Sequence, residues 1–72
     1  MKFQDYTRHY TDGFYNAELH SHRRGYSIRT FYKGEERSCK DFLVAEYGSR
    51  KRCLEEARRD LKNDHFTEII GG

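Results

Sequence analysis

The stretch that decides the fold is residues 25–43, which read GYSIRTFYKGEERSCKDFL. Its first half places Tyr26, Ile28, Thr30 and Tyr32 on one side and Ser27, Arg29 and Phe31 on the other. Such alternation is typical of a β-strand with two different faces. Residues 33–36 (KGEE) carry a glycine turn signal, and residues 37–43 form a second extended segment. We therefore predict an antiparallel hairpin here.

Two more alternating segments precede this hairpin. Residues 14–20 predict a strand, joined to the hairpin by a turn over residues 21–25. Residues 3–10 also alternate, and the Thr11-Asp12-Gly13 turn follows them. We interpret residues 1–12 as either a fourth, edge strand or an arm.

A single helix is predicted after the strands. Tyr47-Gly48-Ser49 ends the extended region, and Ser49 suits a helix N-cap. From Arg50 to about Asn63, one stripe of the helix carries Cys53, Leu54, Ala57 and Leu61. The chain is thus predicted to be a single α+β domain over residues 1–72: a three-stranded antiparallel sheet packed on one C-terminal helix, with residues 65–72 as a tail.

Length and composition narrow the class of protein. The chain has 72 residues, of which 35% are hydrophobic and 36% charged, and 15% are aromatic. One small core built largely from rings is therefore expected. No segment has the length of a membrane span or the apolar run of a secretory signal, so we expect a cytoplasmic protein. We expect Cys39 and Cys53 to be reduced and buried.

Positive charge concentrates in the middle third of the chain. Residues 20–40 contain six Lys or Arg and two Asp or Glu, whereas the net charge of the whole chain is only +2. A basic island beside aromatic residues is typical of proteins that bind a polyanion, and an ordinary solvated face is the alternative.

The sheet face away from the helix is where we look for function. In the expected register it carries Ser27, Arg29, Phe31, Ser38 and Lys40. Strands fit the DNA major groove, where Arg bonds guanine and Asn bonds adenine, so Arg29 is the best base-reading candidate and Asn16 a weaker one. Phe31 fits a thymine methyl, a protein interface or, if the register shifts by one residue, the core.

Two basic groups lie outside that face. Arg23 and Arg24 occupy the predicted turn over residues 21–25 and suit phosphate contacts, which fix register rather than sequence. Arg50, Lys51 and Arg52 occupy the first helical turn, where the helix dipole disfavours positive charge. That position suits a bound phosphate, and tolerated surface charge is the alternative.

Enzymatic and metal sites are not predicted. His20, His22, Cys39 and Cys53 lack zinc-ligand spacing, and residues 13–28 hold only a fragment of a GIY-YIG nuclease opening. No nucleophile triad or phosphate-binding glycine loop is present in the sequence. We expect a non-enzymatic protein with no cofactor and no metal.

The order of several short motifs resembles that of a known family. Tyr26, Gly34, Lys40 with Phe42, Tyr47-Gly48, and Cys53 with Ala57 together resemble the Apetala-type, or ethylene-response-factor-like, DNA-binding domain. The similarity is greatest to the version found in phage and mobile-element homing endonucleases and integrases, and it covers residues 13–64. It implies that the sheet enters the major groove, with Arg29 and Lys40 facing it and Ser27 and Ser38 as secondary contacts. Tyr26, Ile28, Cys39 and Phe42 would face the helix.

The basic island and the open sheet face thus predict a small double-stranded DNA-binding protein, and the resemblance implies that it acts as a phage or mobile-element regulator or recombination accessory. The alternative is a phage-type protein-interaction module that inhibits a host protein through Phe31, Tyr15 and the Glu35-Glu36 turn. An RNA-binding module is a third possibility. No membrane partner is expected, and both a monomer and a homodimer remain open, because one module of this size seldom gives tight specific binding alone.

Overall fold

A computed structural model describes residues 6–70 of the chain and shows one antiparallel sheet with one main helix. The strands are β1 (Thr7–Thr11), β2 (Asn16–His22), β3 (Gly25–Tyr32), β4 (Glu35–Leu43) and β5 (Thr67–Glu68). The helices are α1 (Val44–Tyr47) and α2 (Arg50–Asn63). The order in the sheet is β4-β3-β2-β1-β5, so the chain winds through a meander and its C-terminal segment returns beside β1.

The predicted α+β class and the main helix are confirmed. Helix α2 has the predicted bounds, and the Ser49 side chain accepts a hydrogen bond from the Arg52 N–H at 3.2 Å. The three-stranded prediction is too small, because β1 and β5 extend the sheet to five strands. The N-terminal strand is not an edge, since β5 pairs with it through Tyr10 and Thr11. Residues 3–5 of the expected strand lie outside the described residues.

The turns explain why several strand bounds differ from the prediction. Asp12 accepts the backbone N–H groups of Phe14 and Tyr15 at 2.8 and 2.7 Å, which delays the start of β2 to Asn16. Only Arg23 and Arg24 separate β2 from β3. Lys33 and Gly34 both have positive φ, as a two-residue type I′ turn requires, so β4 begins at Glu35. Helix α1 was not predicted.

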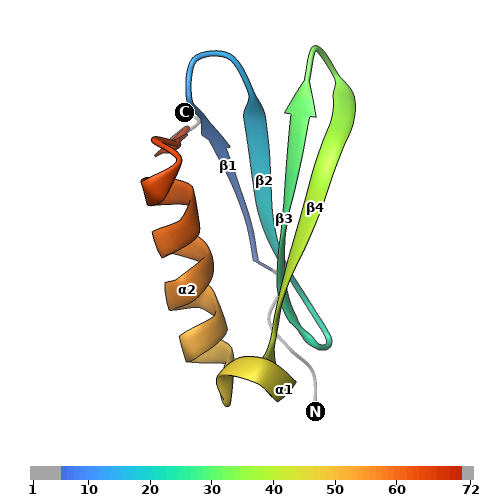
Figure 1. The fold of residues 1–72 in the computed structure, drawn as a ribbon, viewed down its shortest axis with the longest axis vertical. Coiled ribbons are helices and arrows are strands. Elements are labelled where there is room, and N and C mark those ends of the chain that lie inside the picture. Colours follow the sequence, from blue (N-terminus) through green and yellow to red (C-terminus); the bar gives the residue numbers. More distant parts are fainter. Residues whose placement is uncertain (1–5, 71–72) are drawn as a thin grey trace.

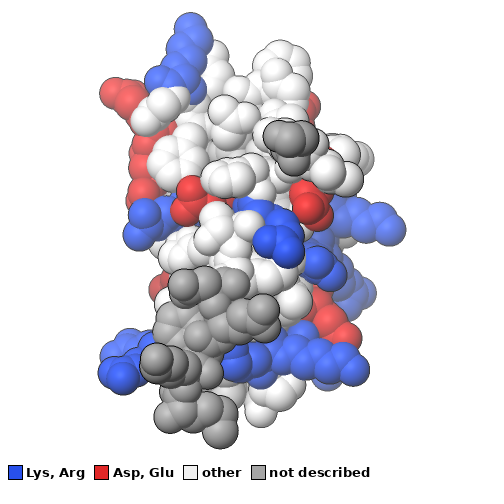
Figure 2. Space-filling model, turned by 180° about the vertical axis from the view of Figure 1, so that it is seen from behind, with Lys and Arg blue, Asp and Glu red and all other residues white. Residues whose placement is uncertain are grey.

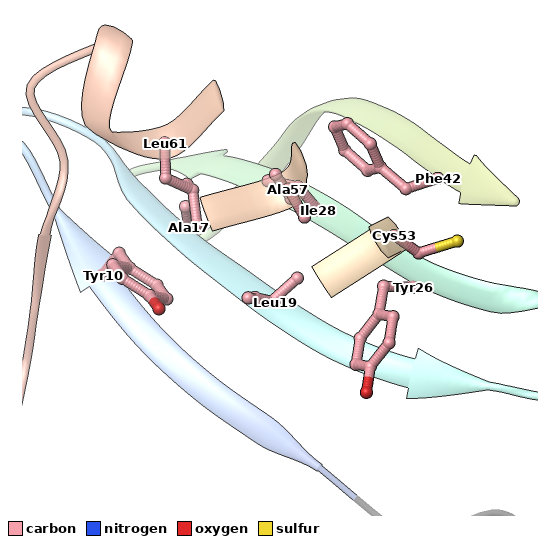
Figure 3. Packing of buried hydrophobic residues seen from close by; sticks show 9 residues of the cluster. All are labelled: Tyr10, Ala17, Leu19, Tyr26, Ile28, Phe42, Cys53, Ala57 and Leu61. Atoms are coloured by element: carbon pink, nitrogen blue, oxygen red, sulfur yellow. The ribbon is translucent and has the colours of Figure 1, made fainter. Parts of the chain in front are cut away.

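The core lies between the sheet and α2 (Figure 3). The sheet contributes rings and aliphatic side chains, and α2 contributes one stripe of small and aliphatic side chains; the buried set is Tyr10, Ala17, Leu19, Tyr26, Ile28, Phe42, Cys53, Ala57 and Leu61. The predicted helix stripe is confirmed at Cys53, Ala57 and Leu61, with Leu54 packed against the cluster. Because small residues line this stripe, the helix approaches the sheet closely.

The register of β4 reverses part of the expected face assignment. Tyr26 pairs with Phe42, Ile28 with Lys40 and Thr30 with Ser38. Since Tyr26 and Ile28 face the helix and side chains alternate along a strand, Ser38 and Lys40 lie on the helix side rather than on the open face. Cys39 pairs with Arg29 and is exposed, so the expectation that it is buried against the helix is wrong.

The two cysteines are therefore expected to differ in reactivity. Cys39 is exposed, whereas Cys53 is fully buried and its pKa is raised by that burial. Because the thiolate is the reactive form, a thiol reagent should modify Cys39 in the native protein and Cys53 only on unfolding. When the native protein is titrated with a thiol reagent, one equivalent of thiol per chain should react quickly. Cys39→Ser should abolish this fast reaction. Rapid modification of both thiols would contradict the burial of Cys53 in the core.

Candidate nucleic-acid interface

The open face of the sheet presents side chains from the residues that alternate with the core. Two rows cross its middle: Glu18, Arg29 and Cys39 are cross-strand neighbours, and so are His20, Ser27 and Asp41. Glu36 reaches the same region, where its Oε1 lies 3.9 Å from the Arg29 Nε. Among the described residues, the middle of the open face thus carries Arg29 beside three carboxylates, whereas the sequence predicted Arg29 and Lys40 on this face.

Arg29 is nevertheless available to a ligand. Its side chain is 47% exposed, and its only ion pair among residues 6–70 is the long contact with Glu36. A pair at that distance between two half-exposed groups contributes little free energy. The Arg29 guanidinium can therefore exchange Glu36 for a better partner.

Ser27 is not available, which corrects its predicted role as a DNA contact. The residue is only 4% exposed, and its Oγ lies 2.8 Å from His22 Nε2 and 2.5 Å from Asp41 Oδ1. The backbone N–H of Arg24 donates to His22 Nδ1 at 3.2 Å, so Nε2 carries the imidazole proton of the neutral ring. His22 then donates to Ser27, and Ser27 donates to Asp41. This chain of hydrogen bonds links the β2–β3 turn to β4.

Lys40 and Ser38 do not lie beside Arg29 on the open face of the sheet. The Lys40 Nζ donates to both carboxylate oxygens of Asp60 in α2, at 3.0 and 3.1 Å, which ties β4 to the helix. Phe31 lies beside a β-bulge and is half-buried, and Asn16 is its exposed cross-strand neighbour. Arg29 and Asn16 remain as the base-reading candidates on the open face.

The predicted phosphate-binding residues meet at one end of the molecule. The β2–β3 turn, α1 and the start of α2 lie together at the lower end in Figure 1. Arg50 donates to the carbonyls of His22 and Gly25 at 2.8 and 3.2 Å, with its guanidinium 5.0 Å from the centre of the Tyr26 ring. The Val44 N–H donates to the Arg24 carbonyl at 2.9 Å. We call this region the basic end; its cationic residues are Arg23, Arg24, Arg50, Lys51 and Arg52.

These cations are not equally free. Arg50 is engaged by the two carbonyls, and Arg52 pairs with Glu56 at 3.7 Å. Arg23, Arg24 and Lys51 are exposed, and no carboxylate of the described chain lies within ion-pair distance of any of them. Figure 2 shows Lys and Arg predominating at the lower end, with acidic side chains mixed among them higher up. Arg23, Arg24 and Lys51 therefore give the basic end positive charge that is not paired with any described carboxylate.

The residues considered for zinc do not converge. Cys39 lies on the open face and Cys53 in the core, so the sheet separates them. Within residues 6–70, no three His, Cys, Asp or Glu side chains are placed to hold a metal ion.

Comparisons with family models, curated proteins and solved structures found no match to this chain. The resemblance to the Apetala-type domain therefore stays a prediction, although β2, β3, β4 and α2 follow in the order that it implies. None of the described helices combines the length and apolar character needed to cross a membrane.

Sequence reasoning identified the members of the basic end but not their proximity. Arg23 and Arg24 were assigned to a turn and Arg50, Lys51 and Arg52 to a helix start, as two separate groups. The antiparallel meander brings both groups to the same end, because β2 runs toward it and β4 returns to it. The sequence did carry an indication of this proximity. In an antiparallel meander β3 runs away from the β2–β3 turn and β4 runs back toward it, so a helix that follows β4 must begin near that turn.

Proposed function

We propose that this protein is a non-enzymatic binder of double-stranded DNA, with phosphate contacts from the basic end and base contacts from the open sheet face around Arg29. The observation that carries the proposal is a group of exposed cations, Arg23, Arg24 and Lys51, that no described carboxylate pairs with, at one end of a sheet whose open face carries the exposed Arg29. Lys and Arg that neutralise phosphates supply most of the affinity for DNA, and strands can enter the major groove. A phage or mobile-element regulator or recombination accessory would use such a surface.

The carboxylates on the open face restrict how DNA would bind. Glu18, Glu36 and Asp41 would repel phosphates near the centre of the sheet. They are compatible with the floor of the major groove, where carboxylates accept hydrogen bonds from cytosine N4. The proposal therefore assigns phosphate contacts to the basic end and leaves base contacts to the sheet.

The salt dependence of binding tests this function. If three to five cations of the basic end neutralise phosphates, log affinity for duplex DNA should fall with log salt at a slope of about −3 to −5. Fluorescence anisotropy with a labelled duplex measures this slope over a series of salt concentrations. A flat dependence, or no duplex binding at low salt, would contradict the proposal and favour the protein-interaction alternative.

Arg29 and Arg24 should differ in what they contribute. Arg29→Ala should lower the preference for the best duplex over a scrambled one by about 1–3 kcal/mol, because a bidentate contact to guanine is lost. Arg24→Ala should weaken binding to both duplexes alike, because phosphates carry no sequence information. A binding selection from random duplexes supplies the preferred sequence. If both variants lose affinity for the two duplexes equally, Arg29 does not read bases.

A further inference from the structure

A groove at the basic end combines arginines with an apolar surface that phosphate binding does not require. It lies between the β2–β3 turn and the junction of β4 with α1, and has a volume of about 610 Å³. Its lining consists of three arginines and three consecutive apolar residues: Arg23, Arg24, Arg50, Leu43, Val44 and Ala45. Volumes of this order are common for ligand-binding sites.

The floor of the groove is apolar and its rim is cationic. Leu43 and Val44 are half-buried and Ala45 is exposed, so the floor remains open to a ligand. A DNA backbone would engage the arginines but would bring nothing apolar to Leu43, Val44 and Ala45. Unpaired bases bind by stacking on aromatic side chains, and the described lining contains none. The ligand that matches both parts carries negative charges on either side of an apolar group.

We infer that this groove binds a short acidic peptide segment of a partner protein, with an apolar side chain of that segment on the floor formed by Leu43, Val44 and Ala45. Arg23 and Arg24 face the flanking carboxylates, and neither has an ion pair with a described residue to exchange. Arginine suits this role because its guanidinium bonds carboxylates in a bidentate manner.

The groove is held in shape before any ligand arrives. The Val44 N–H bonds the Arg24 carbonyl, which fixes the floor to the β2–β3 turn. Arg50 bonds the carbonyls of His22 and Gly25, which fixes one side of the rim. Little ordering of the protein backbone is therefore needed, and a preformed site loses less free energy on binding.

Two matched peptides test the inference on the full chain. The probe is a fluorescein-labelled peptide of Asp and Glu residues with two adjacent leucines at its centre, and the control replaces both leucines with serine at the same charge. The leucine peptide should bind at least about ten-fold more tightly, because apolar burial adds to the charge contacts. Amide resonances of Leu43, Val44 and Ala45 should shift with it. Equal affinity of the two peptides, or no binding, would overturn the inference.

Variants of the protein separate the floor from the rim. Val44→Thr keeps the side-chain shape and the backbone N–H, and should weaken the leucine peptide several-fold while leaving the serine peptide and duplex DNA unchanged. Ala45→Glu places a carboxylate on an exposed position of the floor and should weaken the leucine peptide about ten-fold or more. Lys62→Ala, at the far end of α2, is the control and should change neither peptide.

Peptide and DNA would share Arg23 and Arg24, but the two titrations are separate measurements and can fail separately. Peptide binding without duplex binding would support the groove and remove the proposed function, and the reverse result would remove the groove alone. If a single-stranded oligonucleotide displaces the leucine peptide and shifts the same floor resonances, the groove binds nucleic acid and the inference is overturned.

Discussion

Gly25→Ala is expected to lower the free energy of unfolding by about 2–4 kcal/mol, a loss typical of strong steric clashes in a packed structure. A Cβ atom at position 25 would lie 2.1 Å from the carbonyl oxygen of Phe42, and the φ angle of +153° is one that side-chain-bearing residues rarely adopt. The contact is with backbone, so β3 and β4 must move apart for it to be relieved. The Gly25 carbonyl also accepts a hydrogen bond from Arg50, so a displacement of Gly25 would also disturb this bond at the basic end.

Gly34→Ala is the matched control for this substitution. Gly34 also has a positive φ, of +83°, but a Cβ there would meet no atom within 4 Å. Only the backbone preference is lost, so the cost should be about 1–2 kcal/mol. Chemical denaturation of both variants measures the difference. A Gly25→Ala protein as stable as Gly34→Ala would show that β3 and β4 do not approach as closely as described.

Removing Arg23 and Arg24, which pair with no described carboxylate, should have the largest effect on DNA binding. The double variant Arg23→Ala/Arg24→Ala removes two exposed cations of the β2–β3 turn. Their side chains make no ion pair with a described residue, so the substitutions remove no such contact from the folded protein. Affinity for duplex DNA should fall about ten- to hundred-fold at low salt, and the slope of log affinity against log salt should become shallower by about two. Anisotropy titrations at several salt concentrations measure both quantities.

The control for the double variant removes a cation elsewhere. Lys62 is the basic residue in the last turn of α2, away from the basic end. Lys62→Ala should change the affinity only slightly and leave the slope unchanged, whereas loss of a phosphate contact would reduce it by about one. Equal losses from the double variant and from Lys62→Ala would mean that DNA contacts positive charge without regard to its position. The basic end would then have no special role.

The main helix and its core stripe could be predicted because their signals are local. Ser49 caps the helix, and Cys53, Ala57 and Leu61 recur at helical spacing. The fold class followed from these and from the alternation in residues 26–32. The short β5 could not be predicted, because two residues form it and only its pairing with β1 defines it.

The main error of the prediction was the assignment of the β4 side chains to the two faces of the sheet. It arose because no local pattern in β4 determines the register of the strand. Residues 37–41 alternate only polar side chains and Cys39, so nothing in the strand itself indicates which side is buried. The pairing of Tyr26 with Phe42 determines the register. It places Lys40 on the helix side of the sheet, where its side chain bonds Asp60 of α2. A strand whose two faces are both polar has a weakly specified register. Burial of Phe42 was the one available signal.

The basic end and its groove depend on tertiary proximity. Arg23, Arg24 and Arg50 were each singled out from the sequence, but the bonds from Arg50 to the carbonyls of His22 and Gly25 join segments far apart in the chain. The groove floor combines the last residue of β4, Leu43, with the first two residues of α1, a helix whose four residues gave no helical signal.

The most direct measurement is a titration of the isotope-labelled full chain with its preferred DNA duplex, followed by amide NMR spectra. The account predicts shifts at Arg23, Arg24 and Lys51 and at Arg29 in β3, with Arg59 and Lys62 on the outward side of α2 unchanged. Shifts confined to the outward side of α2, or no shifts at low salt, would contradict it.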